Sequence, residues 1–441
     1  STKIFRLINS EAYMKKFISA FLLAAVFVIS VGAITPKVTA IKAGRLVDTV
    51  AGKGLENQVI LIEDNIIKQV GADVKIPEGA TVIDLSKSTV MPGFIDTHVH
   101  ITGDPGGDYY AVLFRESFVD EAITAHITAK RTLDAGFTSV RNLGAAGFVD
   151  IALKRAIDTG KIPGPRMQCA GIYIGSTGSH GDMNGFSPWL DSRMPAEMSG
   201  IANGADAVRQ KVRYMIKYGA EVIKFGASAG VLSEEASVGA PQFTQEEMNA
   251  IVDEAHMHGI PVAAHAHGTQ AIKMAIRAGV DSVEHASFID DEGIKMAIEK
   301  GTFLSMDIYN DDYILAEYGK FGTPQKIIEK EKLVGRTQRE NFKKAFLAGA
   351  KMTYGTDGGV YPNGFNGRQF AKMVEWGMSP MQAIQAATMT SATLLRWDKT
   401  LGSITAGKFA DIVAVSGDPL QKISILENVE FVMKDGIVYK K

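Results

Sequence analysis

The stretch "GFIDTHVH", residues 93–100, reads as a buried β-strand with polar side chains at alternate positions. Residues two apart on a strand point to the same face, so Asp96, His98 and His100 are expected to emerge together. A buried polar group costs stability unless it finds a partner. Two imidazoles and a carboxylate that converge on one place favour a metal ion as the shared partner.

Seven further short apolar stretches follow along the chain, with room for a helix between most of them. They are residues 137–144, 166–174, 221–228, 261–268, 281–287, 302–309 and 351–359. The intervening segment 246–259 places Met248, Ile251, Val252 and Ala255 at helical spacing. This alternation predicts an α/β fold of the (β/α)8 TIM-barrel type over residues 93–399. In that fold, active sites lie at the C-terminal ends of the strands.

Both ends of the folded region differ in sequence pattern from the alternating strands and helices of the middle. Residues 41–92 and 400–441 contain short β-rich runs separated by turn residues, including a hairpin signal at Asp435-Gly436. Two β-rich ends that flank a different middle predict one small β-sandwich domain formed from both termini.

Residues 1–40 precede these domains and contain a signal-peptide pattern that starts at Met14. Lys15 and Lys16 are followed by an apolar run over 17–31, and small-residue cleavage sites occur at 31–33 and at 38–40. The pattern predicts a periplasmic or secreted protein; a buried N-terminal helix or a retained anchor is the alternative. Residues 1–13 match no pattern.

Composition narrows the class further. A formal net charge of −2 over 441 residues gives no basic surface for nucleic acid, so no nucleic-acid partner is expected. The chain has one cysteine, Cys169, which excludes an intrachain disulfide and a cysteine-rich metal site.

Several predicted strands end in residues that carry chemistry. These are His98 and His100, Lys224, His265 and His267, Glu284 and His285, and Asp357. Lys224 is the most unusual, because a lysine inside an apolar strand is costly unless it is paired or neutralised. Reaction of its amine with CO2 would convert it to a carboxylate that can bridge two metal ions. An ion pair with Glu221, Asp96 or Glu284 is the structural alternative.

These residues together resemble the amidohydrolase superfamily. The resemblance rests on "PGFIDTHVH" at 92–100, the strand lysine, the later strand-end histidines, "GTDGG" at 355–359 and the segment Gly402–Val413, and it extends from residue 41 onward. Within the superfamily the chain is most similar to bacterial Xaa-Pro dipeptidases, or prolidases. The segment "TGSHGD" at 177–182 resembles their Gly-Gly-His-Gly-Asp motif, with Ser179 in place of one glycine.

The resemblance implies a binuclear metal centre with two divalent ions. His98 and His100 would bind one ion, a carboxylated Lys224 would bridge both, His265 and His285 would bind the second, and Asp357 would bind the first. Histidine-rich ligation favours zinc, and manganese, cobalt and iron are alternatives. Two such ions can share a hydroxide that attacks an amide carbonyl. Asp357 would take the proton and pass it to the leaving nitrogen.

The implied substrate is a small molecule, a dipeptide or the C-terminal residue of a short peptide. His180 is the candidate for its carboxylate, with a loop-stabilising histidine as the alternative. His267, Tyr309, Arg141 and Arg368 are further candidates; the alternatives are simple packing for Tyr309, an internal ion pair for Arg141 and a solvated or helix-starting residue for Arg368.

The side-chain preference is open between apolar, basic and proline residues. Glu234 and Glu235 would favour a basic residue if they faced inward. Cyclic-amide or imidazolone hydrolysis on the same barrel is the alternative reaction, and Lys224 argues against the imidazolone type. Barrels of this type commonly associate, so a homo-oligomer is expected.

Overall fold

The protein is described here by a computed structural model. The described residues are 36–108, 112, 115–182, 184–185, 187, 199–235 and 237–441. Residues 38–441 belong to a single structural unit. The predicted signal peptide over 14–33 lies outside the described residues.

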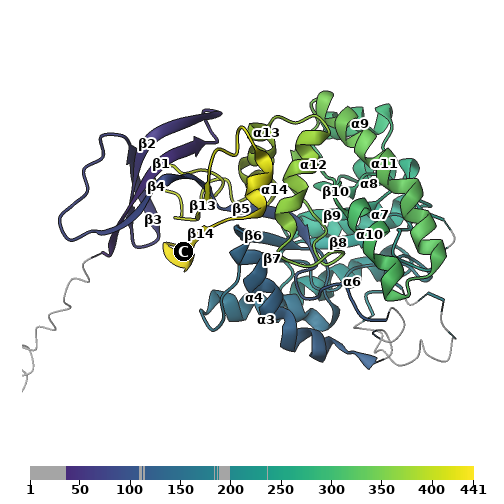
Figure 1. The fold of residues 1–441 in the computed structure, drawn as a ribbon. Coiled ribbons are helices and arrows are strands. Elements are labelled where there is room, and N and C mark those ends of the chain that lie inside the picture. The colour runs from purple at the N-terminus through teal and green to yellow at the C-terminus, as the bar shows by residue number, and fades with distance from the viewer. Residues whose placement is uncertain are drawn as a thin grey trace, which may run out of the picture. The chain divides into compact units, whose positions relative to one another are not determined.

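The two ends of this unit meet in one seven-stranded sheet (Figure 1). Its order is β15-β14-β13-β4-β1-β2-β3. The strands are β1 Val38–Asp48, β2 Lys53–Glu63, β3 Ile66–Gly71, β4 Thr81–Pro92, β13 Ile412–Ser416, β14 Phe431–Lys434 and β15 Ile437–Lys440. The prediction that both termini build one β-rich element therefore agrees with the observed pairing of β4 with β13.

All seven strands share one hydrogen-bonded sheet, so the predicted β-sandwich is not built from two separate sheets, and its layering stays a prediction. Strand β1 pairs antiparallel with β2 and parallel with β4, which continues the ladder from one terminus to the other. The start of β3 is bridged to the segment before β13 through Ile66 and Phe409. The sheet thus curves around its own apolar core, which includes Ile41, Ile60 and Ile412.

Eight short parallel strands occupy the positions that the sequence predicted. They are β5 Phe94–Val99, β6 Phe137–Asn142, β7 Arg166–Cys169, β8 Ile223–Gly226, β9 Val262–Ala266, β10 Ser282–His285, β11 Phe303–Ser305 and β12 Met352–Thr353. They form a sheet of order β5-β6-β7 and a sheet of order β12-β11-β10-β9-β8. Every residue of β5, β8, β9 and β10 is buried, as expected for parallel strands covered by helices.

Backbone hydrogen bonds link the two parallel sheets at both junctions. The amide of His100 donates to the carbonyl of Gly358 at 2.6 Å, just beyond β5 and β12. At the other junction Ile174 donates to Lys224 at 3.0 Å and Gly226 donates back to Ile174 at 3.0 Å.

Helices follow most of the parallel strands and pack on them. They are α3 Phe118–Asp134, α4 Val149–Asp158, α6 Ala205–Tyr218, α7 Gln245–Met257, α8 Thr269–Ala278, α9 Asp291–Lys300, α10 Asn310–Glu317, α11 Gln325–Leu347, α12 Gln369–Glu375, α13 Pro380–Gln385 and α14 Ser391–Leu394. The helix predicted over 246–259 is α7. It begins after Thr244, which forms a capping box with Glu247, and ends before Gly259, whose φ is 73°.

The described N-terminus bears on the predicted cleavage sites. Val38, Thr39 and Ala40 are the first residues of β1, and Thr39 and Ala40 are buried between β2 and β4. Cleavage after Ala40 would remove part of this strand, so the boundary at residue 40 is three residues too late. Among the residues that the structure describes, no helix has the length and apolar character needed to cross a membrane.

Candidate metal centre

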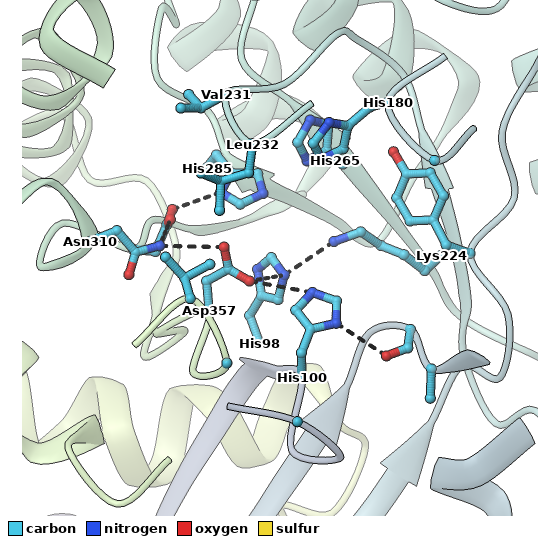
Figure 2. A pocket seen from close by; sticks show the side chains of 18 of the residues that line it. His98, His100, His180, Lys224, Val231, Leu232, His265, His285, Asn310 and Asp357 are labelled. Atoms are coloured by element: carbon cyan, nitrogen blue, oxygen red, sulfur yellow. Dashed lines mark hydrogen bonds and ion pairs between the residues drawn. The ribbon is translucent and has the colours of Figure 1, made fainter. Parts of the chain in front are cut away.

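One cavity of about 980 Å³ opens beyond the carboxyl ends of the parallel strands. Its walls include eight of the eleven residues that the sequence predicted to hold metal or substrate: His98, His100, His180, Lys224, His265, His267, His285 and Asp357. Figure 2 shows the imidazoles, the lysine and the carboxylate pointing toward one another. Residues up to about 260 positions apart therefore meet at one place because parallel strands end at the same edge.

Asp357 lies at the meeting point of the first histidine pair. Its Oδ1 is 3.3 Å from Nε2 of His98 and 3.3 Å from Nε2 of His100. The carboxylate of Asp357 and the imidazoles of His98 and His285 have ligand atoms within 4.8 Å of one another. This spacing allows one ion to contact all three side chains.

Acceptors behind the histidines fix how each ring is turned. Nδ1 of His98 is 3.2 Å from Oε2 of Glu284, and Nδ1 of His100 is 3.1 Å from the carbonyl oxygen of Gly144. Nδ1 of His285 is 2.9 Å from Oδ1 of Asp307. A hydrogen-bond acceptor therefore occupies Nδ1 of His100 and of His285, whereas Nδ1 of His98 lies near Glu284 without a hydrogen bond. Metal-binding histidines in proteins are usually held in this way.

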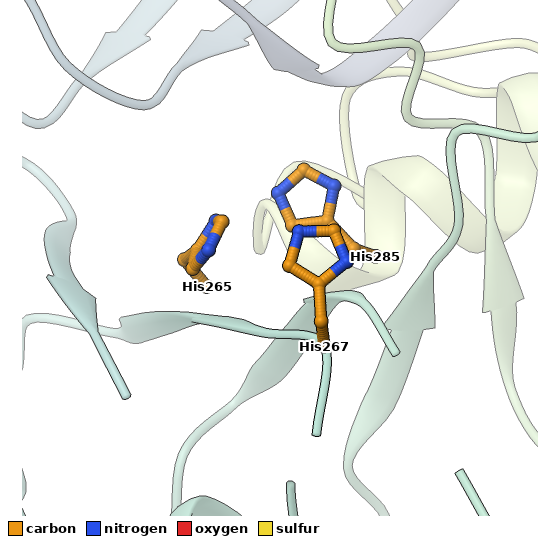
Figure 3. Close-up of side chains that lie close together, drawn as sticks. All are labelled: His265, His267 and His285. Carbon is orange, nitrogen blue, oxygen red and sulfur yellow. The ribbon is translucent and has the colours of Figure 1, made fainter. Parts of the chain in front are cut away.

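The second group consists of His265, His267 and His285, whose ligand nitrogens also lie within 4.8 Å of one another (Figure 3). The rings of His267 and His285 stack with their centroids 4.7 Å apart. Nε2 of His265 is buried and has no hydrogen-bond partner among the described residues. An orphaned buried nitrogen is expensive, and a metal ion would satisfy it. The donor set therefore fits divalent metal.

Lys224 is buried, with 2% of the residue exposed. Its Nζ is 3.3 Å from Nε2 of His98, and no carboxylate of the described residues lies within ion-pair distance of it. The three partners proposed as alternatives are engaged elsewhere: Glu221 with Lys154 at 3.7 Å, Glu284 with Arg141 at 2.8 Å, and Asp96 with Thr356. The ion-pair explanation of Lys224 therefore fails.

Burial and charge shift the protonation of the site. Burial, with help from Lys224, lowers the pKa of His98 to about 4, and burial lowers the pKa of Lys224 to about 8. Burial would raise the pKa of Asp357, but His98, His100 and His285 outweigh it and hold that pKa well below its usual range. The site therefore presents a neutral His98 and an ionised carboxylate, the forms that bind metal.

The backbone is strained at two of these residues. His285 has a φ of 67° and Asp357 a φ of 56°, in the left-handed region that non-glycine residues rarely adopt. Such strain persists only where surrounding contacts hold it, and it is concentrated at functional sites.

Asp96, which the strand pattern placed beside the histidines, supports the site from behind. It is fully buried and accepts hydrogen bonds from the amide of Thr356 at 3.1 Å, the hydroxyl of Thr356 at 2.6 Å and Nδ2 of Asn366 at 2.8 Å. Asp96 is absent from both groups of possible metal ligands. Asp96 thus anchors the turn that carries Asp357, and the expectation that Asp96 shares the metal with the histidines is wrong.

Three predicted substrate contacts do not line the cavity: Arg141, Tyr309 and Arg368. Arg141 is 1% exposed and donates to Glu284 at 2.8 Å, Ser282 at 3.0 Å and the carbonyl of Thr97 at 2.6 Å. The internal ion pair is therefore the correct reading of Arg141. Arg368 donates to the hydroxyl of Tyr309 at 2.8 Å, so these two residues hold each other beside the site.

His180 and its surroundings form one wall. Its Nδ1 is 2.7 Å from the hydroxyl of Ser233, and its ring stacks on His265 with centroids 4.3 Å apart. A Cβ at position 230 would come within 2.4 Å of the His180 ring, so Gly230 is required for this approach. Glu234 and Glu235 do not line the cavity; they contact Lys326 and Gln242.

Sequence reasoning missed several polar residues that line the cavity: Asp307, Asn310, Glu331 and Gln338. Gln338 donates to Asp307 at 2.8 Å, and Asn310 donates to Asp307 at 2.6 Å and to Asp357 at 3.3 Å. Asp307 follows β11 and could have been found as a polar strand-end residue. Glu331 and Gln338 lie in a helix crowded with charged residues, where no spacing separates them from surface residues.

Comparison with known proteins finds a matching family model and several similar proteins. A family model described as "Amidohydrolase family" matches residues 89–440. A crystal structure of a Xaa-Pro dipeptidase with methionine bound in its active site is 40% identical, with a TM-score of 0.87 over 92% of this chain and 100% of that one. A prolidase complexed with N-methylphosphonate-L-proline is 31% identical, with a TM-score of 0.84 over the same shares. Ochratoxinase of Aspergillus niger is 32% identical over 92% of this chain and 87% of its own.

Proposed function

The chain belongs to the amidohydrolase family and is a hydrolytic enzyme, and from that premise we propose that it cleaves the amide bond of dipeptides or of the C-terminal residue of short peptides. The observation that supports this most directly is the convergence of His98, His100, His265, His285 and Asp357 on one cavity. Relatives described as a Xaa-Pro dipeptidase and a prolidase support the peptide substrate.

Two divalent metal ions are proposed as the cofactor, with zinc favoured by the histidine-rich donors. His98, His100 and Asp357 would hold one ion, and His265 and His285 the other. When bound, such ions would supply Lewis-acid activation of the amide carbonyl and of the attacking water near neutral pH. The orphaned Nε2 of His265 and the acceptors behind His98, His100 and His285 support this assignment.

Lys224 is proposed to be carboxylated. The buried ammonium group would first lose one proton, and the neutral amine nitrogen would then bond to the carbon of CO2 and release a second. A buried cation would thereby be replaced by a carbamate anion, a type of group that can serve as a metal ligand. The absence of a carboxylate partner for Lys224 among the described residues supports this step. Incubation with 13C-labelled bicarbonate should give a carbamate signal in the carbon NMR spectrum of the protein, and a Lys224→Met variant should lack it.

The residues of the chain have distinct tasks in the reaction. Asp357 would accept a proton at Oδ1 or Oδ2 and return it to the leaving amide nitrogen, first as a general base and then as a general acid. Asn310, 3.3 Å from Oδ2, would keep that carboxylate oriented. His180 would hold the terminal carboxylate of the peptide, and His267 would contact the substrate beside His285.

The remaining sequence predictions fit this proposal. The hydrogen bonds at both junctions between the parallel sheets support a closed (β/α)8 barrel. The signal-peptide pattern supports a periplasmic or secreted enzyme cleaved at residues 31–33, which leaves β1 intact. A homo-oligomer remains a prediction that solution mass would test.

The decisive experiment measures the ratio of metal to protein and the hydrolysis of a library of L-Xaa-L-Xaa dipeptides by the same preparation. We expect two metals per chain, release of free amino acids, and loss of activity after chelation that the metal restores. One metal per chain with no peptide cleavage would contradict the proposal and favour cyclic-amide or imidazolone hydrolysis, which the same preparation would then show.

A further inference from the structure

Glu331 is a buried carboxyl group that the proposed chemistry does not use. It lies on α11, lines the cavity and is 3% exposed. Among the described residues it makes no hydrogen bond and no ion pair. Each of the other carboxylates of the cavity that the structure describes is engaged, for example Asp307 with Gln338 and Glu121 with Thr102. A buried carboxyl group without a partner is costly, which calls for an explanation.

The arrangement of α11 shows where Glu331 lies relative to the metal ligands. Glu331, Val334 and Gln338 are spaced by three and four residues, so they share one face of the helix, and all three line the cavity. Gln338 contacts Asp307, which holds His285. Seven residues of helix separate Glu331 from Gln338, about 10 Å at the usual rise. The carboxyl group of Glu331 thus lines the same cavity as the predicted metal ligands but lies about two helical turns from Gln338.

The wall between these two points is apolar. It is formed by Val231, Leu232, Ile314, Tyr318, Val334 and Val360, which belong to two adjoining hydrophobic clusters that both contact Leu232. Figure 2 shows Val231, Leu232 and Asn310 among the residues around the predicted metal ligands, with His180 against His265. The cavity therefore has an apolar arm that includes the carboxyl group of Glu331, and its residues Val231 and Leu232 directly precede Ser233, the partner of His180.

The charges around Glu331 leave it available for a cation. Burial, together with Asp311 and Asp307, raises the pKa of Glu331 to about 8, while Arg339 opposes the rise. Arg339 is itself engaged, with Nη1 3.2 Å from Asp311 and Nη2 3.1 Å from Asp312. Without a bound cation the carboxyl group therefore holds its proton near neutral pH, and a ligand cation beside it would lower this pKa and form an ion pair with the ionised carboxylate.

We infer that this arm selects a substrate with a long cationic side chain, lysine or arginine, next to the scissile amide. Such side chains lay an aliphatic stem along apolar surface and carry a charge at the tip, which matches an apolar wall that leads to a carboxylate. Glu331 is then a specificity residue that touches the substrate. The inference rests on the proposed peptidase function and adds the class of side chain.

The test compares lysine with norleucine, which keeps the four-carbon stem and lacks the ammonium group. The metal-loaded enzyme is assayed with Ala-Lys, Ala-norleucine, Lys-Ala and norleucine-Ala. For at least one pair we expect kcat/KM to be tenfold or more higher for the lysine peptide, mainly through a lower KM. In Glu331→Gln the preference should fall to within about twofold, mainly because the KM for the lysine peptide rises.

Glu329→Gln is the matched control, because Glu329 is exposed on the same helix and pairs with Lys332. It should keep the lysine preference of the native enzyme. Equal cleavage of lysine and norleucine peptides by the native enzyme, or a preference that survives Glu331→Gln, would overturn the inference alone. Failure to cleave any of the four dipeptides, while other dipeptides of the library are cleaved, would overturn this inference alone; failure to cleave any dipeptide of the library would overturn the proposed function and this inference with it.

Discussion

At the scale of single residues, the site depends on side chains whose geometry is imposed by their neighbours. Asp357 sits at a φ of 56° between His98 and His100, and Asp96 fixes the preceding turn through Thr356. His285 sits at a φ of 67°, with Asp307 behind it. Side chains held in this way lose little conformational freedom when substrate binds. Proton transfer requires such fixed positions, because the donor and acceptor must stay within a short distance.

Asp357→Asn should abolish turnover and leave the fold intact. The amide has nearly the same shape but cannot accept and return a proton, so kcat is expected to fall by at least 10²-fold. The variant is checked by dipeptide hydrolysis together with circular dichroism and metal content. Near-normal turnover at normal folding would remove Asp357 from its proposed role.

The pH dependence of stability should reveal Glu331. Its pKa is raised to about 8 in the folded protein from an ordinary value of 4.5, so the folded state binds the extra proton between these values. Stability therefore falls as the pH rises through about 4.5 to 8, because the unfolded state ionises more easily, and each unit of pKa elevation is worth about 1.4 kcal/mol. Burial is the largest cause of this raised pKa; Asp311, Asp307 and Asp357 add to it, and Arg339 opposes it.

Glu331→Gln removes this cost. After chelation of metal, its melting temperature should match that of the native protein near pH 4.5 and exceed it by several degrees at pH 9. A difference that is constant with pH would show that Glu331 has an ordinary pKa in the folded state.

At the scale of elements, α11 serves the cavity in two ways from adjacent residues. Lys330 is buried and its ammonium group donates to the carbonyls of Gly230 at 2.9 Å, Ser233 at 2.6 Å and Glu235 at 3.3 Å. This holds the loop that carries Val231, Leu232 and the partner of His180. Glu331, one residue later, faces the cavity itself.

Lys330→Met should loosen that loop. Removing the ammonium leaves buried carbonyls without a donor, a cost of about 1–3 kcal/mol, and the substrate wall loses its support. We expect a lower melting temperature and a KM raised severalfold with a smaller change in kcat. Lys332→Met, at an exposed position of the same helix, is the control; equal effects of the two substitutions would contradict the loop-anchoring role.

At the scale of the whole molecule, the seven-stranded sheet and the parallel strands are joined by charged side chains. Nη1 of Arg166, at the start of β7, donates to Asp411 at 2.7 Å and to Ser139 at 3.0 Å, and Nη2 contacts Asp435. Lys434 donates to the carbonyl of Gly164 at 2.8 Å. The last residues of the chain thereby fix the position of β7, which precedes the loop with His180.

Arg166→Met should destabilise the protein without acting on the chemistry. Asp411 is 5% exposed and would keep a buried charge without its cation, at a cost of roughly 3 kcal/mol. Denaturant unfolding should show this loss, and the folded fraction should retain its kcat. Asp411→Asn in the same chain should recover part of the stability; no recovery would show that the loss comes from another contact.

The sequence by itself determined the eight parallel strands and the strand-end residues that now share the cavity. Buried strands are short apolar runs, and alternation with a period of two places His98 or Lys224 on a predictable face, so local pattern suffices. The period-two pattern could not distinguish the supporting role of Asp96 from the predicted ligand role of His98, because both side chains point to the same face of the strand and differ only in their position along it.

Only the tertiary structure decided which charged side chains enter the cavity. Arg141 follows the strand pattern as well as any predicted ligand does. Its side-chain partners, Ser282 and Glu284, come from β10, more than 140 residues later, and they engage its guanidinium group away from the cavity. Glu331 lies in a helix rich in surface charges, and only the packing of α11 against the strand ends buries it. Contacts between distant segments have no local signature, since their free energy depends on which surfaces meet after folding.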